Sequence, residues 1–435
     1  MRRRDLLKGA AAIAAAPLVN GPLARIAPSR RGDVVDGARV NEWLSRFDAI
    51  GRTPTGINRV AYSEFDLAGR AFAIERIRES GFTPRIDAAG NILARLEGRE
   101  SLPPILIGSH VDSVTDGGNF DGPVGSFGAL EVARTLRETN ARLRHPVEVV
   151  IWANEEGGTI GSKLAVGDTG TLDLDAMARS GRTHRQGIAL VGGDLSKLAT
   201  AERAKGSVHC YLELHIEQGG NLEKAGRTIG VVLGIVGLRW YEVTVTGFAN
   251  HAGATPMDQR HDAILAAAKF TVAVNDAIRG EAGAQVATVG RMVPTPNTRN
   301  VIAGGVELTV DLRDLDAAKV ARFAERFQRI AAEIGQATGT TFAFKRSASS
   351  EPAMADARVM DIIAASADSL GLAHQRMPSG AGHDAQEVAR ICPMGMIFVP
   401  SVGGISHSPR EYTKPEDVVH GVNVLLNAVK RVDSL

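Results

Sequence analysis

The sequence predicts an α/β protein in which a smaller domain is inserted into a larger one. Continuous apolar runs at residues 104–108 and 147–153 bracket a helical pattern at 127–137, as expected for buried strands joined by a crossover helix. Between residues 238 and 346 the pattern changes to alternating strands and long helices in the order β-α-β-β-α-β of a ferredoxin-like unit. We therefore expect a mixed-sheet α/β domain at 36–237 and 350–435, with a ferredoxin-like domain inserted at 238–349.

The other elements follow from the same periodicities. Apolar residues recur at helical spacing over 40–47 and 68–80, and residues 85–96 alternate around Gly90-Asn91 like a hairpin. Within the insertion we expect strands at 240–247, 286–293, 306–312 and 340–345, and helices at 258–279 and 317–334. The chain then continues with a helix at 359–370, a strand at 395–399 and a closing helix at 415–429.

The composition is that of a globular protein that acts on small molecules. The chain has 435 residues, of which 44% are hydrophobic and 23% charged, so it is long enough for two sizeable cores. The formal net charge is +1 and long basic runs are absent, which excludes the usual electrostatic footprint of a nucleic-acid binder. Cys210 and Cys392 both lie in apolar surroundings, and we predict buried thiols in preference to a disulfide bridge.

The first residues have the pattern of an export signal. Arginines at positions 2–4 precede Asp5-Leu6-Leu7-Lys8 and an apolar, alanine-rich run at 9–19 that is too short to remain as a membrane anchor. The segment is similar to a twin-arginine signal, with Leu6 where an aromatic residue is commonest. We predict a signal peptide at 1–27 and a periplasmic protein, with a frayed amphipathic start as the alternative.

The loop after the first buried strand, GSHVDSVTDGGNFDG, combines an imidazole with carboxylates. His110 and Asp112 are two residues apart on an extended chain and share a face, and Asp121 follows the turn at Gly117-Gly118. A carboxylate beside an imidazole fixes the tautomer of a metal-binding histidine. A solvated Asp-rich turn is the alternative, but it would not explain a histidine that emerges from a buried strand.

Two adjacent glutamates end the second buried strand. Glu155 and Glu156 point in different directions there, so one can bind a metal while the other stays free as a base. Two more histidines are candidates: His215 in LELHIEQG, for which a satisfied core histidine is the alternative, and His407 in the loop GGISHSP. These nitrogen and oxygen donors suit zinc, manganese or cobalt, which indicates metal-assisted hydrolysis.

Taken in order, these motifs resemble one family. The stretches GSHVDSVTDGGNFDG, NEEGG, LELHIEQGGNLE, NHAGATPMDQRHDA and GGISHSPRE, with PNTRNVIAGGVELTVDLR and SGAGHDAQ between them, are similar to the amidase branch of the M20 metallohydrolases. That branch contains N-carbamoyl-L-amino-acid hydrolases, allantoate amidohydrolases and β-ureidopropionases. The resemblance extends from about residue 43 to 429. His215 favours the amidase branch, because the peptidase branch usually has a carboxylate at that position.

The resemblance implies a site for two divalent metal ions, with zinc, manganese, cobalt and nickel all possible. The implied ligands are a bridging carboxylate and one pair of side chains on either side of it: Asp121, His110 with His215, and Glu156 with His407. Glu155 would be the general base for the attacking water, and Asp112 would orient His110.

The resemblance also implies substrate contacts. His251 stands where a histidine reaches across a dimer to polarise the scissile carbonyl, with Asn300 as its companion. Arg313 stands where an arginine binds the substrate α-carboxylate through both prongs of its guanidinium. The remaining candidates would contact the ureido or carboxylate end: Gln218, Ser379, Gly380 and His383. The alternatives are a helix-start histidine for His251 and a salt bridge with Asp311 or Asp314 for Arg313.

One stretch departs from the family pattern. After the paired glutamates the family usually continues with Gly-x-Arg-Phe and several more residues, whereas here Gly157-Gly158-Thr159-Ile160 leads directly to Gly161-Ser162. The shortened loop leaves the implied metal ligands intact but changes the expected substrate pocket.

We therefore expect a periplasmic homodimeric amidohydrolase with two metal ions. It would hydrolyse a linear C–N bond of a small N-carbamoyl amino acid or ureido acid, while the inserted domain closes over the substrate as a lid and forms the dimer contact. A dipeptidase or aminoacylase of the same superfamily is the first alternative, because export and a shortened loop suit peptides. A metal-dependent binding protein without turnover is the second, and the presence of Glu155 beside all five ligand candidates argues against it.

Overall fold

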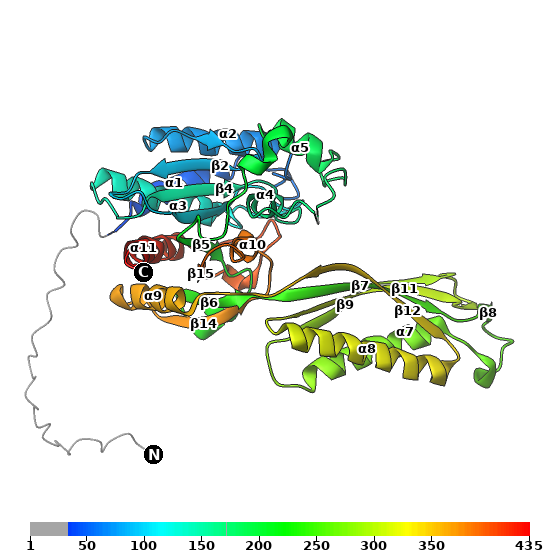
Figure 1. The fold of residues 1–435 in the computed structure, drawn as a ribbon. Helices are drawn as coiled ribbons and strands as arrows, with labels where there is room; N and C mark the ends of the chain where they lie inside the picture. The colour runs from blue at the N-terminus through cyan, green and yellow to red at the C-terminus, as the bar shows by residue number, and fades with distance from the viewer. Residues whose placement is uncertain (1–33, 171) are drawn as a thin grey trace, which may run out of the picture.

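Two large sheets and one two-stranded ladder organise the described chain. The computed structural model describes residues 34–170 and 172–435, in which one sheet has nine strands and the other has four (Figure 1). The mixed α/β class predicted from the sequence is confirmed. The predicted signal peptide at 1–27 lies outside the described residues. Cys210 and Cys392 are free and buried, as predicted.

The nine-stranded sheet is mixed, and its centre is parallel. The strand order is β1-β2-β4-β3-β5-β15-β6-β13, and β14 pairs with β6. Strands β4, β3, β5 and β15 run parallel and are buried along their whole length, so their carboxyl ends meet at one edge. The strand bounds are β1 Arg85–Ile86, β2 Ile92–Leu96, β3 Ile105–His110, β4 Val147–Trp152, β5 Cys210–Ile216, β6 Ile229–Ile235, β13 Ala353–Met354, β14 His374–Ser379 and β15 Met394–Val399.

Helices pack against this sheet and against one another, and α3 is the most buried of them. Helix α3 is held between β3 and the helices α1 and α11, and the ring centroid of its Phe127 lies 5.0 Å from that of Phe47 on α1. The long helices are α1 Gly37–Phe47, α2 Glu64–Glu79, α3 Pro123–Glu138, α9 Ala357–Ser369 and α11 Pro415–Val432. The short ones are α4 Ile160–Ala165, α5 His184–Leu190, α6 Asn221–Ala225 and α10 Asp384–Val388, with 3-10 turns at Leu195–Thr200, Met257–Gln259 and Val402–Gly404. No described helix is long and apolar enough to span a membrane.

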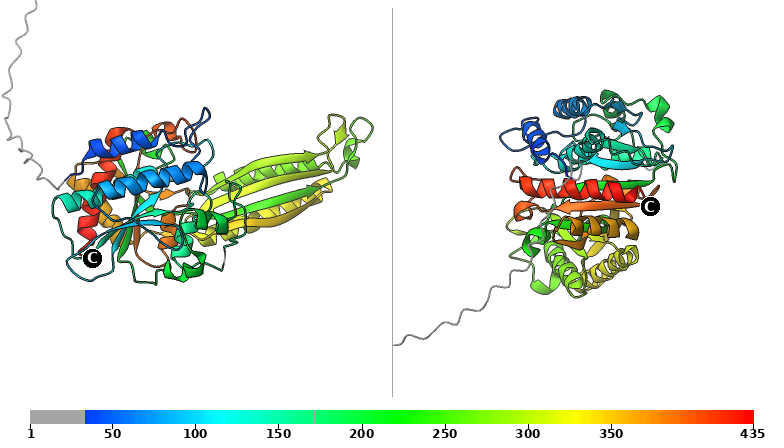
Figure 2. Two further views of the ribbon diagram at one scale, coloured as in Figure 1. Left: turned by 90° about the horizontal axis from the view of Figure 1, so that it is seen from above. Right: turned by 90° about the vertical axis from the view of Figure 1, so that its left-hand side faces the viewer.

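The inserted segment forms the four-stranded sheet, and its two long helices cover one face (Figures 1 and 2). The strand order is β12-β7-β11-β9 and every pairing is antiparallel. Phe270, Phe323 and Phe327 pack from the helices into a separate core. The elements are β7 Gly237–Thr246, α7 Ala263–Arg279, β9 Val286–Thr295, β11 Gly305–Asp314, α8 Ala317–Thr338 and β12 Thr341–Ser350.

A two-stranded ladder extends this inserted unit at its far end. Strand β8, Asn250–His251, pairs with β10, Val301–Ile302. In Figure 1 β8 lies at the end of the inserted unit that is remote from the nine-stranded sheet.

Three details differ from the sequence expectations. Helix α7 starts at Ala263 and not at residue 258, because the Asp262 side chain accepts hydrogen bonds from the backbone of Ile264 and Leu265 and caps the helix there. Strand β12 continues to Ser350, five residues beyond the predicted end, because it keeps pairing with β7. Strands β6 and β14 have no counterpart among the predicted elements; β6 contains two glycines and β14 a proline, which weaken a strand pattern.

Candidate metal centre and active site

The loops at the carboxyl edge of the four parallel strands carry the candidate ligands. His110 ends β3 and His215 lies in β5, and both side chains are fully buried. Asp121 stands in the loop before α3, Glu156 follows β4, and His407 follows β15. Because the carboxyl ends of parallel strands meet at one edge, these residues come together from distant parts of the sequence. Open α/β sheets bind their ligands at this edge.

The first group of candidate ligands is His110, Asp121 and His215, whose donor atoms lie within 4.8 Å of one another. The Oδ1 atom of Asp121 is 3.6 Å from Nε2 of His110 and 3.2 Å from Nε2 of His215. The other ring nitrogens face backbone oxygens, at 3.1 Å for His110 and 2.9 Å for His215. Both Nε2 atoms are therefore directed at Asp121, and both are buried without a hydrogen-bond partner among the described residues.

The loop before α3 fits closely against the His110 ring. Gly122 has a φ of 83°, and a Cβ there would lie 2.5 Å from the His110 imidazole. Only glycine allows this approach. The loop is thereby held where Asp121 faces both histidines.

The second group is Asp121, Glu156 and His407. The Oδ2 atom of Asp121 is 3.3 Å from Nε2 of His407, which is 3.6 Å from Oε1 of Glu156. That glutamate oxygen is also buried without a hydrogen-bond partner among the described residues. Asp121 thus gives one oxygen to each group.

The donor set fits divalent cations on chemical grounds. Orphaned buried polar atoms are rare in folded proteins and call for an explanation, such as an ion. Three imidazoles and two carboxylates, one of them shared, are ligands that zinc and its first-row neighbours accept. A third group of potential donors, Glu213 with His215 and His383, has less free capacity, because Glu213 accepts hydrogen bonds from Ser109, Tyr211 and the amide of Ala385.

Asp112 holds the glutamate loop. Its carboxylate accepts the backbone N–H of Glu155 at 3.3 Å and that of Glu156 at 3.1 Å. The Nδ1 atom of His110 lies 3.1 Å from the peptide oxygen of Asp112 and 3.6 Å from its carboxylate. The contact expected between Asp112 and His110 is thus made mainly through the backbone.

Glu155 stands beside the first group of ligands. Its Oε2 atom is 3.7 Å from Nε2 of His110, and the residue is 9% exposed. Burial, assisted by the charges of Asp384, Glu156 and Asp112, raises the pKa of Glu155 well above its usual range. A carboxyl group with a raised pKa next to a metal site is suited to take up and release a proton.

The pKa values of two neighbouring carboxyl groups, Glu156 and Asp121, are also shifted. Burial and the charge of Asp121 raise the pKa of Glu156 to about 7. Burial acts to raise the pKa of Asp121 too, but the nearby imidazoles of His110 and His215 outweigh it, so that pKa falls well below its usual range. Bound cations would compensate this excess of buried carboxylate.

The predicted substrate contacts in the larger domain lie directly against the ligands. The Nε2 atom of Gln218 donates to Oδ2 of Asp121 at 2.6 Å, and its Oε1 atom is buried without a hydrogen-bond partner among the described residues. The ring of His383 is buried 4.5 Å from that of His215, and its Nε2 atom is 2.8 Å from Oγ of Ser379. Burial and the neighbouring His215 lower the pKa of His383 well below its usual value, which favours the neutral form of the ring.

Arg313 is engaged within the protein. Its Nη2 atom is 2.9 Å from Asp311 Oδ2, and its Nη1 atom donates to the peptide oxygen of Gly380 at 2.7 Å. The salt bridge with Asp311 that we considered as an alternative is thus present, and a substrate carboxylate would have to displace Asp311 from the guanidinium.

His251 and Asn300 lie together but far from the candidate ligands. The N–H of Ala252 donates to the peptide oxygen of Asn300 at 3.0 Å, and His251 pairs with Val301 in the β8–β10 ladder. This ladder is the remote tip of the inserted unit in Figure 1. One chain alone therefore does not bring these two residues to the cluster.

The shortened loop after β4 is a tight turn. Asn154, Gly158 and Thr159 have φ values of 56°, 115° and 56°. The turn reaches α4 within a few residues because three positions adopt left-handed or otherwise positive φ values.

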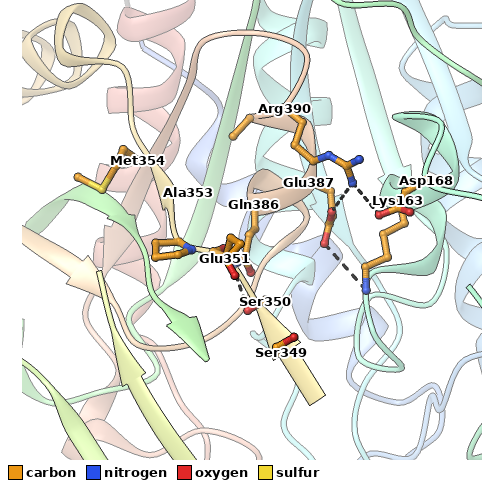
Figure 3. Close-up of a pocket in the computed structure, with 12 residues that line it drawn as sticks. Lys163, Asp168, Ser349, Ser350, Glu351, Ala353, Met354, Gln386, Glu387 and Arg390 are labelled. Atoms are coloured by element: carbon orange, nitrogen blue, oxygen red, sulfur yellow. Dashed lines mark hydrogen bonds and ion pairs between the residues drawn. The ribbon is translucent and has the colours of Figure 1, made fainter. Parts of the chain in front are cut away.

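A cavity of about 650 Å³ lies at the base of the inserted unit, between α4 and α10 on one side and the end of β12 on the other (Figure 3). Glu387 and Arg390 line it and belong to one ion-pair network with Lys163 and Asp168. Gln386 donates to the peptide oxygen of Glu351 at 2.7 Å across it. No candidate metal ligand lines this cavity, so it is separate from the candidate metal centre.

The structure adds buried acids that the sequence analysis missed. Glu411 contacts both ligand loops, Glu213 lies in one group with His215 and His383, and Asp384 accepts a hydrogen bond from Ser162 at 2.6 Å. Glu213 and Glu411 stand inside the quoted stretches LELHIEQGGNLE and GGISHSPRE, and Asp384 inside SGAGHDAQ. Their place in these motifs was the available signal.

The chain is similar to known proteins in sequence and in structure. Residues 106–431 match the model of peptidase family M20/M25/M40. The chain is 36% identical to an N-carbamoyl-L-amino acid amidohydrolase of Geobacillus stearothermophilus over 91% of this chain and 98% of the relative. It is 33% identical to a ureidoglycolate hydrolase of Arabidopsis thaliana, over 90% and 85% of the two chains. An amidase of the hydantoinase/carbamoylase family from Burkholderia multivorans superposes with a TM-score of 0.84 at 38% identity, over 92% of this chain and 99% of that one.

Proposed function

Because the chain belongs to peptidase family M20/M25/M40 and resembles its amidases over nearly its whole described length, we propose that it is an amidohydrolase that depends on two divalent metal ions. Its substrate is a small N-carbamoyl amino acid or ureido acid, whose linear C–N bond it hydrolyses. The observation that carries this proposal is Asp121, which gives one carboxylate oxygen to each of two groups of candidate ligand atoms beside Glu155.

The protein side chains would hold the ions in two places. His110 and His215 would hold one ion, Glu156 and His407 would hold the other, and Asp121 would be shared between them. When bound, two such ions act as Lewis acids that activate water and stabilise negative charge on the attacked carbonyl. Zinc is the first choice, and manganese, cobalt and nickel accept the same donors.

Glu155 moves the proton. It takes a proton from the attacking water and delivers it to the leaving nitrogen, because its carboxylate lies at the edge of the first ligand group. Asp112 positions it by holding the backbone of the glutamate loop. For an N-carbamoyl amino acid the products are the amino acid, carbon dioxide and ammonia.

Substrate binding uses both parts of the chain. Arg313 exchanges Asp311 for the substrate carboxylate, which fits the two prongs of its guanidinium. Gln218 and the loop at 379–383, with Ser379, Gly380 and His383, contact the ureido or carboxylate end. The inserted unit, which is joined to the larger domain at residues 236–237 and 351–352, closes over the site as a lid.

The proposed roles of His251 and Asn300, at the remote tip of the inserted unit, require a second copy of the chain. In a homodimer, His251 and Asn300 of one protomer would polarise the scissile carbonyl in the site of its partner. The lid also offers apolar side chains for a dimer contact, since Val272 of α7 is 61% exposed and Val286 of β9 is 51% exposed. We further propose that residues 1–27 direct the protein to the periplasm.

A dipeptidase or aminoacylase activity is the second candidate, favoured by the tight turn at 154–159. Ammonia release and new amine groups should be measured in parallel for the metal-reconstituted protein on N-carbamoyl-L-amino acids, allantoate, N-acyl amino acids and dipeptides. Ammonia from a carbamoyl or ureido substrate supports the proposal. New amine without ammonia, from dipeptides or N-acyl amino acids alone, would replace it with the second candidate.

A further inference from the structure

Glu411 joins the two loops that carry Asp121 and His407. Its Oε1 atom accepts the backbone N–H groups of Phe120 at 2.9 Å and Asp121 at 3.1 Å. Its Oε2 atom accepts the hydroxyl of Ser406 at 2.8 Å and the backbone N–H of His407 at 3.3 Å. One carboxylate therefore lies within hydrogen-bond distance of two donors from each loop.

The residues around Glu411 restrict the position of its side chain. Glu411 is 6% exposed, and its own N–H donates to the peptide oxygen of Ser408 at 3.0 Å, which closes a turn just after His407. A Cβ at Gly118 would lie 2.3 Å from Cβ of Glu411, so the first loop passes directly over the carboxylate. His407 has a φ of 52°, a left-handed backbone that a non-glycine residue adopts only when its neighbours hold it.

We call the contacts of Glu411 with the two ligand loops the Glu411 clamp. Ser406 links this clamp to Asp121, the proposed bridging ligand. Its hydroxyl lies 2.9 Å from Oδ2 of Asp121 and 2.8 Å from Oε2 of Glu411. A hydroxyl has one proton, so it cannot satisfy both carboxylates at once. When Asp121 directs its oxygens at cations, this proton is left to Glu411 and the clamp is complete.

We propose that Glu411 is a positioning residue for the second metal ion, because it fixes the separation between bridging Asp121 and terminal His407. The proposal rests on the proposed two-metal site. No other residue type of similar size serves as well: glutamine has one acceptor oxygen and one NH2 group, and that NH2 would face the donors of one of the two loops. Aspartate is one methylene shorter and reaches only one loop.

The test compares Glu411→Gln with a matched carboxylate clamp elsewhere. Asp433 is 7% exposed and accepts the consecutive backbone N–H groups of Arg144 at 2.9 Å and His145 at 2.8 Å. It lies at the amino-terminal edge of the parallel strands, opposite the ligands. Asp433→Asn therefore removes a similar clamp without touching a ligand loop.

Metal stoichiometry and affinity would be measured with zinc or manganese against a chromophoric chelator, in the absence of substrate. We expect Glu411→Gln to keep one tight ion and to bind the other roughly 10–100-fold more weakly, which is the usual effect of losing an outer-shell partner. Excess metal should restore its occupancy. Asp433→Asn should bind both ions like the wild type.

Two results would overturn the role of Glu411: wild-type affinity for both ions in Glu411→Gln, or an equal loss in Asp433→Asn. If Glu411→Gln does not fold, Ser406→Ala removes a single contact of the clamp and should weaken the same ion to a smaller extent; unchanged binding in this variant would also reject the proposal. A wild type that binds two ions without releasing ammonia leaves this inference standing and rejects the proposed function. A wild type that binds no divalent ion rejects both.

Discussion

The carboxylate of Asp112 accepts the backbone N–H of Glu155 at 3.3 Å. Its other oxygen accepts the N–H of Glu156 at 3.1 Å, so one side chain of the loop after β3 holds the loop after β4. The proposed general base and a proposed metal ligand are thus placed by the same carboxylate. Asp112 is fully buried, and these amides are the donors that satisfy it.

Asp112→Asn should lower kcat/KM by roughly 10–100-fold, because an amide accepts with one oxygen only and its NH2 group faces the second backbone donor. The measurement is steady-state kinetics together with metal content. Asp116→Asn is the control from the same loop, since Asp116 contacts Thr55 and Asn58 at the surface and no candidate ligand. Equal activity in both variants would contradict the positioning role.

If His251 acts in the partner's site, two inactive variants should restore hydrolytic activity when their subunits are mixed. In a mixture of Glu155→Gln and His251→Ala subunits, a heterodimer has one site with both residues intact if His251 acts in the partner's site. Random mixing should then recover about a quarter of the wild-type activity, since half of the dimers carry one working site of two. Activity no higher than that of either variant alone would show that His251 does not act across a dimer.

Metal removal should destabilise the protein. Asp121, Glu155, Glu156 and Glu411 are buried close together, and bound cations relieve their repulsion. A ligand at about 100 times its Kd stabilises the folded state by about 2.7 kcal/mol. The Tm should therefore fall after treatment with a chelator and rise again with added zinc or manganese. A Tm that is independent of both would contradict the metal site.

A histidine pair predicts a loss of stability in acid. The rings of His145 and His209 stack with centroids 3.8 Å apart, and Nε2 of His209 is 2.8 Å from the peptide oxygen of Val432 at the end of α11. Burial, followed by the charge of His145, lowers the pKa of His209 below 6.5 although the Val432 contact opposes this. The unfolded chain binds the proton more readily, so the stabilisation is present above pH 6.5 and is lost as the pH falls below that value.

The matching variant is His209→Gln, which keeps a side-chain N–H donor for Val432 and does not titrate. We expect the difference in unfolding free energy between wild type and variant to shrink, or to change sign, between pH 7.5 and 5.5 in chelator-treated samples. A constant difference over this range would mean that His209 has the same pKa in both states.

The ligand candidates were accessible from the sequence because they follow buried strands. The apolar runs before His110 and Glu155 predicted parallel strands, and parallel strands bring their carboxyl ends to one edge. The structure confirmed the mixed α/β class, and the comparisons with known proteins confirmed the family. The positions of His251 and Asn300 in a partner's site came from family resemblance and stay a prediction, as do the roles of the metal ligands.

Other features could not be read from the sequence, because they depend on contacts between distant residues. The hydrogen bonds of Glu411 to the Asp121 loop join segments that only the folded sheet brings together. The sequence favoured substrate binding for Arg313 and left a salt bridge with Asp311 or Asp314 as the alternative; the structure pairs it with Asp311. Local periodicity has no signal for such contacts.

The central claim is that Glu155 transfers a proton next to two metal ions during hydrolysis of a carbamoyl or ureido C–N bond. Glu155→Gln preserves the size of the side chain and removes its basicity, so metal content and ammonia release should be measured together on this variant and the wild type. We predict that the variant retains both ions while turnover falls by several orders of magnitude. Unchanged turnover with unchanged metal content would contradict the account.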